Sequence, residues 1–215
     1  GHHPFTLVNA DTGDGRLRFA IKALGDYTAQ LAQQVAVGQQ VWVEGPYGRF
    51  DFRQARAPGQ GWVAAGIGAT PFVAWLESLV ANPAQAPLVQ LHYCVRNAEE
   101  AVFAERMQQL CAQLPSVTLH IHHSDVTGKV ASDALLASAG PQASVWFCGP
   151  QGFGQALRDT MQRLLLGRRL RRQRRSQRTA GRRQRRLGLF HLLVAAGPAV
   201  DQRTAPRHVV LGARH

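Results

Sequence analysis

The chain has 215 residues, 45% of them hydrophobic, which is enough for one large or two small domains with a substantial core. Its formal charge of +12 is unevenly distributed, because residues 1–166 hold only 11 of the 25 basic residues but 12 of the 13 acidic ones. This distribution excludes a uniformly basic protein. Three cysteines, Cys94, Cys111 and Cys148, follow neither a disulfide nor a zinc spacing, and GHHPF at the start is no signal-peptide pattern; both favour a reducing, cytoplasmic location.

The first part of the chain predicts antiparallel β-structure. Residues 5–8 form a short apolar strand, residues 11–15 a glycine-containing turn, and residues 16–24 a second strand in which apolar side chains alternate. A short helix capped by Thr28 and a strand over residues 41–43 follow. Residues 53–61 contain two Gly and one Pro, which predicts a linker and a domain boundary near Gln60.

Beyond this boundary, strands and helices alternate, which predicts an α/β domain with a parallel sheet. In four units, a short connection joins a strand to the helix that follows it. The units are 62–65 with a helix from Thr70, 89–95 with 98–113, 117–122 with a helix from Ser132, and 145–148 with a helix from Gly152. In such sheets the ligands bind at the carboxyl ends of the strands.

The sequence Gly66-Ile-Gly-Ala-Thr-Pro71 joins the first of these strands to its helix. Glycines allow the backbone to approach a ligand closely, and the start of a helix attracts phosphate. The pattern is not the complete GxGxxG fingerprint of dinucleotide-binding proteins. Alone it therefore leaves a phosphate site and a plain strand-to-helix turn equally open.

The arginine-rich block of residues 168–186 has 11 Arg and no acidic residue. Such a block cannot bury a core, so we expect disorder. The block has three interpretations: a solvated tail, a tail that binds nucleic acid or an anionic surface, and an out-of-frame continuation of a GC-rich gene. The last one explains the sequence best. Residues 187–200 are too short to span a bilayer.

Six motifs in order resemble the ferredoxin-NADP reductase superfamily, and most closely the FAD/NADPH module of bacterial ferric reductase-like and NADPH oxidase-like proteins. They are HPFT (3–6), IKALGDYT (21–28), EGPYG (44–48), GIGATP (66–71), YCVR (93–96) and FCGP (147–150). The resemblance implies a partial antiparallel β-barrel for FAD over residues 1–60 and a Rossmann-like NADP-binding domain over residues 61–166. Residues 167–215 have no counterpart and form the expected disordered tail.

The resemblance assigns residues on the flavin side. It places four at the flavin, His3, Pro4, Phe5 and Thr6, with Thr6 near its reacting edge, and three at the FAD pyrophosphate, Lys22, Gly25 and Thr28. A cation and the free N–H groups of a helix start suit two phosphates. Without the resemblance, Pro4 and Phe5 are ordinary strand residues and Lys22 belongs to a solvated strand face.

The resemblance also assigns residues for NADPH. Its pyrophosphate would contact the turn, namely Gly66, Gly68, Ala69, Thr70 and Pro71, and its nicotinamide would lie beside Cys148, Gly149 and Pro150. Arg96, with Lys129 as a second cation, would hold a ribose 2′-phosphate, because a guanidinium pairs with phosphate bidentately. The alternatives are an Arg96 paired with Glu99 or Glu100, and a Cys148 that is only a buried structural cysteine.

The function that the resemblance implies is hydride transfer from NADPH to FAD, followed by single-electron transfer to haem, ferric ion or oxygen. The implied partner is a haem-containing membrane domain, with no nucleic acid. The four strand histidines, His92, His120, His122 and His123, have no metal-like partners and are expected to pack or face solvent. Since the family has further barrel strands before HPFT, we expect this chain to bind NADPH better than FAD. The competing function is nucleic-acid or anionic-surface binding through the arginine-rich tail.

Overall fold

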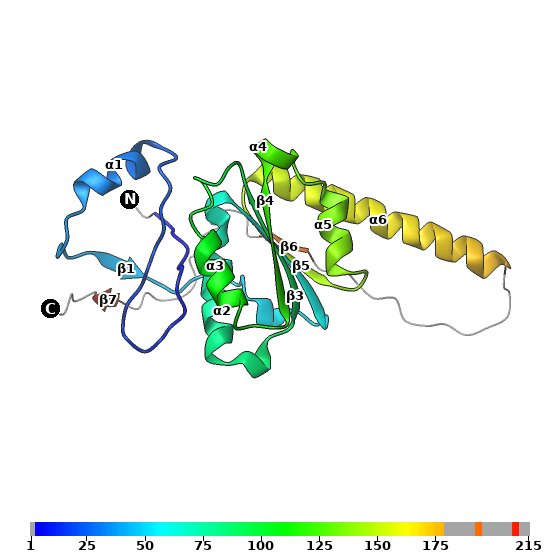
Figure 1. Ribbon diagram of the computed structural model, residues 1–215, viewed down its shortest axis with the longest axis horizontal. Helices are drawn as coiled ribbons and strands as arrows, with labels where there is room; N and C mark the ends of the chain where they lie inside the picture. Colours follow the sequence, from blue (N-terminus) through cyan, green and yellow to red (C-terminus); the bar gives the residue numbers. More distant parts are fainter. Residues whose placement is uncertain (1–2, 179–191, 195–207, 211–215) are drawn as a thin grey trace.

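The computed structural model describes the backbone of residues 3–178, 192–194 and 208–210, and the side chains of residues 3–168. A small irregular part with antiparallel pairing precedes a three-layered α/β domain (Figure 1). The expected fold class, an α/β domain behind a fragment of antiparallel β-structure, is confirmed, although the strands of this fragment do not close a barrel.

The sheet of the α/β domain is entirely parallel, in the order β4-β3-β2-β5-β6. Its strands are β2 (Gly59–Ala65), β3 (Leu88–Val95), β4 (Val117–His123), β5 (Ser144–Cys148) and β6 (Leu192–Val194). The chain passes outward from β2 to β4 and then returns to the other side of β2. The direction therefore reverses between β2 and β5, which is where a doubly wound sheet opens a ligand-binding crevice.

Helices cover both faces of this sheet (Figure 1). The main helices are α2 (Thr70–Ala81), α3 (Ala104–Cys111), α5 (Ser132–Ala139) and α6 (Gln151–Arg178), and short ones are η2 (Gly66–Ala69), η3 (Pro83–Gln85) and α4 (Ser124–Thr127). Side chains of α2 and α3 form one buried cluster with alternate strand residues, and those of α5 and α6 form a second cluster with the intervening ones. Both faces are thus buried, which explains the nearly continuous apolar strands.

Helix α3 begins six residues later than the sequence pattern predicts. The side-chain oxygen of Asn97 accepts the backbone N–H of Glu100 at 3.0 Å, and successive turns continue from Ala98 to Ala104. An asparagine that bonds the backbone ahead of it stabilises a turn instead of a helix. The loop after β3 is therefore longer than expected.

The two strands expected over residues 5–8 and 16–24 are not formed as a ladder. One isolated antiparallel bridge joins Leu7 and Phe19, and the N–H of Val8 donates to the carbonyl of Arg18 at 2.9 Å. A single two-stranded hairpin is marginal without further strands to support it. The prediction of a hairpin around this turn is correct, but the prediction of two regular strands in it is wrong.

The rest of this part contains α1 (Asp26–Gln34) and β1 (Trp42–Glu44), and β1 pairs antiparallel with β7 (His208–Val210). Helix α1 begins two residues before the expected Thr28. Thr28 is therefore not the N-cap: its hydroxyl oxygen accepts the N–H groups of Leu24 and Gly25 at 3.0 and 3.1 Å from inside the first turn.

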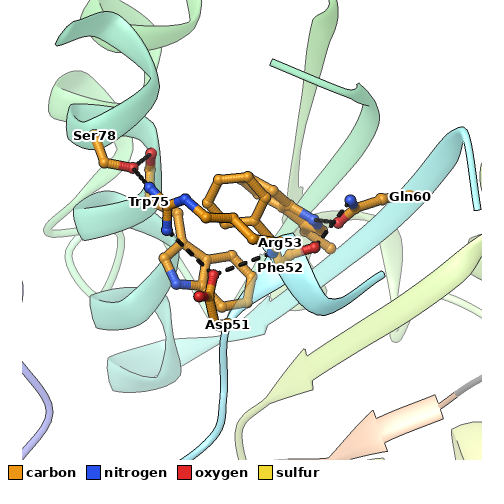
Figure 2. A network of polar contacts seen from close by, with 7 residues as sticks. Asp51, Phe52, Arg53, Gln60, Trp75 and Ser78 are labelled. Atoms are coloured by element: carbon orange, nitrogen blue, oxygen red, sulfur yellow. Dashed lines mark hydrogen bonds and ion pairs between the residues drawn. The ribbon is translucent and has the colours of Figure 1, made fainter. Parts of the chain in front are cut away.

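The segment expected to be a linker is packed into the α/β domain. The short helix η1 (Phe52–Gln54) overlaps the start of the expected linker at residue 53, and the Phe52 side chain just before it is only 2% exposed. The Gln60 amide donates to the Phe52 carbonyl at 3.2 Å (Figure 2). The Trp62 indole donates to the Gln60 side-chain oxygen at 2.8 Å. Composition alone conceals this packing, because the two aromatic residues Phe50 and Phe52 are surrounded by small and polar residues.

Six aromatic side chains form one cluster here, with neighbouring ring centroids 4.8–5.9 Å apart. The members of this aromatic cluster are Phe50, Phe52, Trp62, Phe72, Trp75 and Trp146. Arg53 lies over the Phe52 ring, with its guanidinium carbon 4.5 Å from the ring centre, and its Nη2 group donates to the Ser78 hydroxyl at 3.1 Å (Figure 2). The cluster attaches residues 50–54 to α2 and β5.

Helix α6 continues through Arg178, although the composition of residues 167–178 predicts disorder. Arginine is a good helix former, and residues added to an existing helix need no new nucleus. Residues 179–191, which include the rest of the arginine-rich block, lie outside the described residues. Within the described part of the chain, no helix is long and apolar enough to cross a membrane.

Removal of the Phe52 ring should destabilise the protein strongly. Phe52→Ala leaves a cavity in the aromatic cluster and should lower the free energy of unfolding by about 3–5 kcal/mol. Leu88→Ala is the control, because Leu88 is 67% exposed; it should change stability by less than about 0.5 kcal/mol. Urea titrations of both variants measure the difference, and equal small effects would show that the segment is not packed as described.

Candidate functional site

The turn after β2 has the backbone geometry of a ligand-binding turn. Gly66 has a φ of +55°, which glycine adopts without strain, and η2 then leads directly into α2. No side chain caps the start of α2, and Pro71 lies in its first turn. The positive end of this helix is therefore not neutralised by a side chain of its own cap.

Two glycines allow this turn to contact the end of β5. A Cβ atom on Gly68 would overlap the Cys148 carbonyl and lie 2.9 Å from the Gly149 nitrogen. A Cβ atom on Gly149 would lie 2.7 Å from the Ala65 Cβ. Since Ala64 and Cys148 are register partners, the two strand ends meet at the point where the sheet order reverses.

Only the outer part of the turn is accessible. Gly66 and Ile67 are half-buried, whereas Gly68, Ala69, Thr70 and Pro71 are buried. A bound anion can therefore reach the backbone at Gly66 and Ile67. The four buried residues pack within the domain. Their predicted contact with a pyrophosphate stays a prediction.

Cys148 ends β5 as a half-buried thiol. Burial raises its pKa to about 11, so the side chain is neutral at physiological pH. A thiol in this state is a poor nucleophile and packs as a small apolar group. Gly149 and Pro150 follow it, and the Pro150 carbonyl accepts the N–H groups of Phe153 and Gly154 at 3.1 and 3.2 Å, which starts α6.

Arg96 and Lys129 lie on exposed loops beyond the carboxyl ends of the adjacent strands β3 and β4. The loops are joined, because the Asp125 N–H donates to the Arg96 carbonyl at 3.0 Å. Among the ion pairs of the described residues, Glu100 pairs with Lys22 at 3.7 Å and none involves Arg96. The guanidinium of Arg96 is thus available to an anionic ligand.

The flavin-side residues form a second group around the start of α1. The ring of His3 stacks on Tyr27 with centroids 3.6 Å apart, and Phe5 contacts Phe19 edge-on at 6.5 Å. All four residues of the HPFT motif are exposed. Their predicted contact with a flavin ring stays a prediction.

The start of α1 offers a smaller anion site than the sequence suggests. The N–H groups of Leu24 and Gly25 are already bonded to the Thr28 hydroxyl, so phosphate contacts there depend on the residues that follow Gly25. Lys22 is nearby in sequence, and its exposed pair with Glu100 can be exchanged for a phosphate at little cost.

The structure thus brings the NADP-side candidates together at the carboxyl edge of the sheet, and it brings His3, Gly25 and Thr28 of the flavin-side candidates to the start of α1. Two interactions between the two parts involve acidic residues to which the sequence assigned no such role: Glu100 pairs with Lys22, and Glu77 accepts the Ala10 N–H at 3.1 Å. An acidic residue in a mostly apolar helix was the signal available for Glu77.

Three histidines on β3 and β4 form a stacked cluster. His92 Nδ1 lies 2.9 Å from His122 Nε2, His92 Nε2 lies 2.7 Å from the Ser138 hydroxyl, and the His92 and His120 rings stack at 4.7 Å. Burial, with a contribution from neighbouring histidines, lowers the pKa of His92 to about 3 and also lowers that of His122. Within the described residues, no group of three or more His, Cys, Asp or Glu could hold a metal ion.

Comparison with known proteins shows a similarity for the α/β domain. Residues 62–159 match the oxidoreductase NAD-binding domain. The chain is 32% identical over 134 residues to the carnitine monooxygenase reductase subunit of Escherichia coli, covering 62% of this chain and 40% of that protein. It is 33% identical over 147 residues to the vanillate O-demethylase oxidoreductase of Pseudomonas putida, covering 65% and 44%. The chain thus spans less than half the length of these two relatives.

Solved structures extend the similarity beyond this domain. The flavohaem-like FAD/NAD-binding domain of nitric oxide dioxygenase from Vibrio cholerae is 25% identical, with a TM-score of 0.59 over 88% of this chain and 75% of that one. That match is much longer than residues 62–159, so it includes segments outside the NAD-binding domain.

A methyl group at Gly68 should destabilise the contact between the two strand ends. Gly68→Ala places a Cβ against the Cys148 carbonyl and should lower the free energy of unfolding by about 1–3 kcal/mol. Gly152→Ala is the control, since its Cβ meets nothing within 4 Å in helix α6; it should be neutral or slightly stabilising. Urea unfolding of both variants measures this, and a neutral Gly68→Ala would contradict the close approach.

The histidine cluster should make the protein sensitive to acid. The pKa of His92 is lower in the folded state, so its stabilising effect is complete above about pH 6.5 and is lost as pH falls toward about 3. From about pH 7 to about pH 5 this loss should reach about 2 kcal/mol.

Unfolding free energies measured across this range should therefore depend less on pH in His92→Gln than in the unchanged chain. His123→Gln is the matched control, because His123 takes no part in the stack; its pH profile should follow the unchanged chain. Identical profiles for His92→Gln and the unchanged chain would refute the prediction.

Proposed function

We propose that the chain is a flavin-dependent oxidoreductase module of the ferredoxin-NADP reductase superfamily, because its α/β domain matches the oxidoreductase NAD-binding domain over residues 62–159. It takes a hydride from NADPH onto FAD and passes single electrons to an acceptor. The proposed division is a flavin-side part over residues 1–60, an NADP-binding domain over 61–166, and an additional segment over 167–215.

The observation that carries this proposal is the contact between the β2 turn and the end of β5. A dinucleotide must lie across the point where the sheet order reverses, and here two glycines bring both strand ends together without side chains between them. The uncapped start of α2 gives this crevice a positive end for the pyrophosphate.

The preference for NADPH over NADH rests on Arg96. It is exposed at the carboxyl end of β3, where dinucleotide-binding folds of this kind contact the adenine ribose, and it has no ion pair within the described residues. A planar guanidinium can bind a 2′-phosphate through two parallel hydrogen bonds. Lys129, on the neighbouring loop, supplies a second positive charge.

The residues that would hold FAD lie around α1. The ring of His3, stacked on Tyr27, offers a flat surface, and Lys22 with the first turn of α1 offers a cation and N–H groups for phosphate. When bound, FAD supplies the redox chemistry, accepting two electrons as hydride and releasing them singly. The chain's contribution is to orient both cofactors, and the neutral Cys148 thiol fits a packing role beside the nicotinamide.

The proposed acceptor is a metal centre in a partner domain or subunit. One similar protein is named a monooxygenase reductase subunit, another an O-demethylase oxidoreductase, and a third is the FAD/NAD-binding domain of a nitric oxide dioxygenase, which supports an oxygenase or haem acceptor. The ferric reductase-like module remains our suggested subgroup within the superfamily. A cytoplasmic location is proposed, since three free cysteines suit a reducing compartment.

Replacement of Arg96 tests the cofactor assignment. Arg96→Ala removes hydrogen bonds to a charged phosphate and should weaken NADPH binding about 10- to 100-fold, while NADH binding changes by less than about twofold. Titration calorimetry with both nucleotides measures this. Arg158→Ala is the control, because it removes the same charge from an exposed position on α6. Equal losses for NADPH and NADH, or for both variants, would reject the assignment.

A further inference from the structure

Glu77 connects the two parts of the molecule. It lies on α2 with a side chain that is only 12% exposed. One carboxylate oxygen, Oε2, accepts the backbone N–H of Ala10 at 3.1 Å. The other, Oε1, accepts two bonds from the Arg106 guanidinium on α3, at 2.7 and 3.3 Å. The carboxylate thus joins α2, α3 and the N-terminal hairpin (residues 7–19) at one point.

The hairpin presents its N–H group to Glu77 in a fixed orientation. Asn9 is 8% exposed, and its amide donates to the carbonyls of Ala10 and Arg16 at 2.9 and 3.0 Å. Its side-chain oxygen accepts the N–H of Arg18 at 2.8 Å. Because one side chain holds both sides of the hairpin, the Ala10 N–H points outward from a rigid turn.

The two ends of the Glu77 interaction have different roles. The Arg106 pair lies within the α/β domain, so it fixes the carboxylate but does not connect the two parts. The bond to Ala10 crosses between them. The ion pair of Lys22 with Glu100 also crosses between the two parts, but it is 3.7 Å long and exposed on both sides, and such pairs contribute little. Val8, adjacent to Asn9, packs against the core cluster of the α/β domain and supports the same contact.

We propose that Glu77 is a positioning residue that docks the N-terminal hairpin, and with it the flavin motif of residues 3–6, against the NADP-binding domain. This inference rests on the proposed function, since a reductase needs its flavin held at a fixed distance from the nicotinamide. The flavin motif comes directly before the hairpin in the chain. A shift of the hairpin therefore moves the flavin site relative to Gly66 and Cys148, and hydride transfer is sensitive to such displacements.

Two variants separate docking from simple packing. Glu77→Ala removes the acceptor of the Ala10 N–H together with the Arg106 partner, whereas Arg106→Ala removes only the bond within the α/β domain. Hydrogen exchange of the full chain should be about tenfold or more faster over residues 8–18 in Glu77→Ala, and unchanged there in Arg106→Ala. Unchanged exchange in Glu77→Ala, or equal acceleration in both variants, would overturn the proposal.

A kinetic measurement tests the positioning role. With FAD added, the rate of flavin reduction at saturating NADPH should fall about tenfold or more in Glu77→Ala, while the NADPH dissociation constant stays within about twofold. A stability loss alone does not separate these two parameters in this way. An unchanged rate combined with loosened exchange would reject the positioning role.

If Glu77→Ala does not fold, Glu77→Gln decides the question. Its amide oxygen can still accept the Ala10 N–H but without charge, so exchange over residues 8–18 should rise by a smaller factor than tenfold and flavin reduction should slow correspondingly. No change in either would overturn the proposal. Failure of the unchanged chain to reduce added FAD would instead refute the proposed function, and the exchange comparison would still decide whether Glu77 docks the hairpin.

Discussion

The close approach of the β2 turn to the end of β5 is the constraint on which the candidate site depends. A side chain at Gly68 or Gly149 would force the two strand ends apart. Because these positions carry none, the turn that leads into α2 contacts the end of β5, from which α6 follows, and Gly68 lies against the carbonyl of the half-buried Cys148. One steric requirement therefore sets the position of an uncapped helix start and of a neutral thiol together.

Helix α2 connects the β2 turn to the aromatic cluster and to the N-terminal hairpin. Its first turn contributes to the crevice, its apolar side inserts Phe72 and Trp75 into the aromatic cluster, and Glu77 contacts the hairpin on another side. Residues 50–54 pack on the same helix through Phe50 and Phe52. The flavin-side part is consequently attached to α2 at two separate places, by aromatic packing and by a charge-assisted hydrogen bond.

The sequence predicts the α/β domain well, because buried parallel strands are apolar runs and glycine turns separate them from amphipathic helices. It predicts β3, β4 and β5 to within one residue at each end, and the start of α2 at Thr70. It fails where distant contacts decide the structure. Phe52 directly precedes the stretch predicted as a linker, yet it packs against Trp62 and Trp75, which no local pattern shows.

The same reasoning explains which candidate residues the sequence could identify. Arg96 and the glycine turn follow directly from strand ends, so a one-dimensional pattern is enough to select them. Glu77 and Glu100 lie on a helix and a loop, and only the folded chain reveals that each faces the other part of the molecule. The residues proposed to bind a cofactor are thus marked by local sequence, whereas the residues that connect the two parts are marked by their tertiary partners. A reductase whose chemistry belongs to its cofactors depends on both kinds, since bound cofactors react only when the protein holds them at the correct separation.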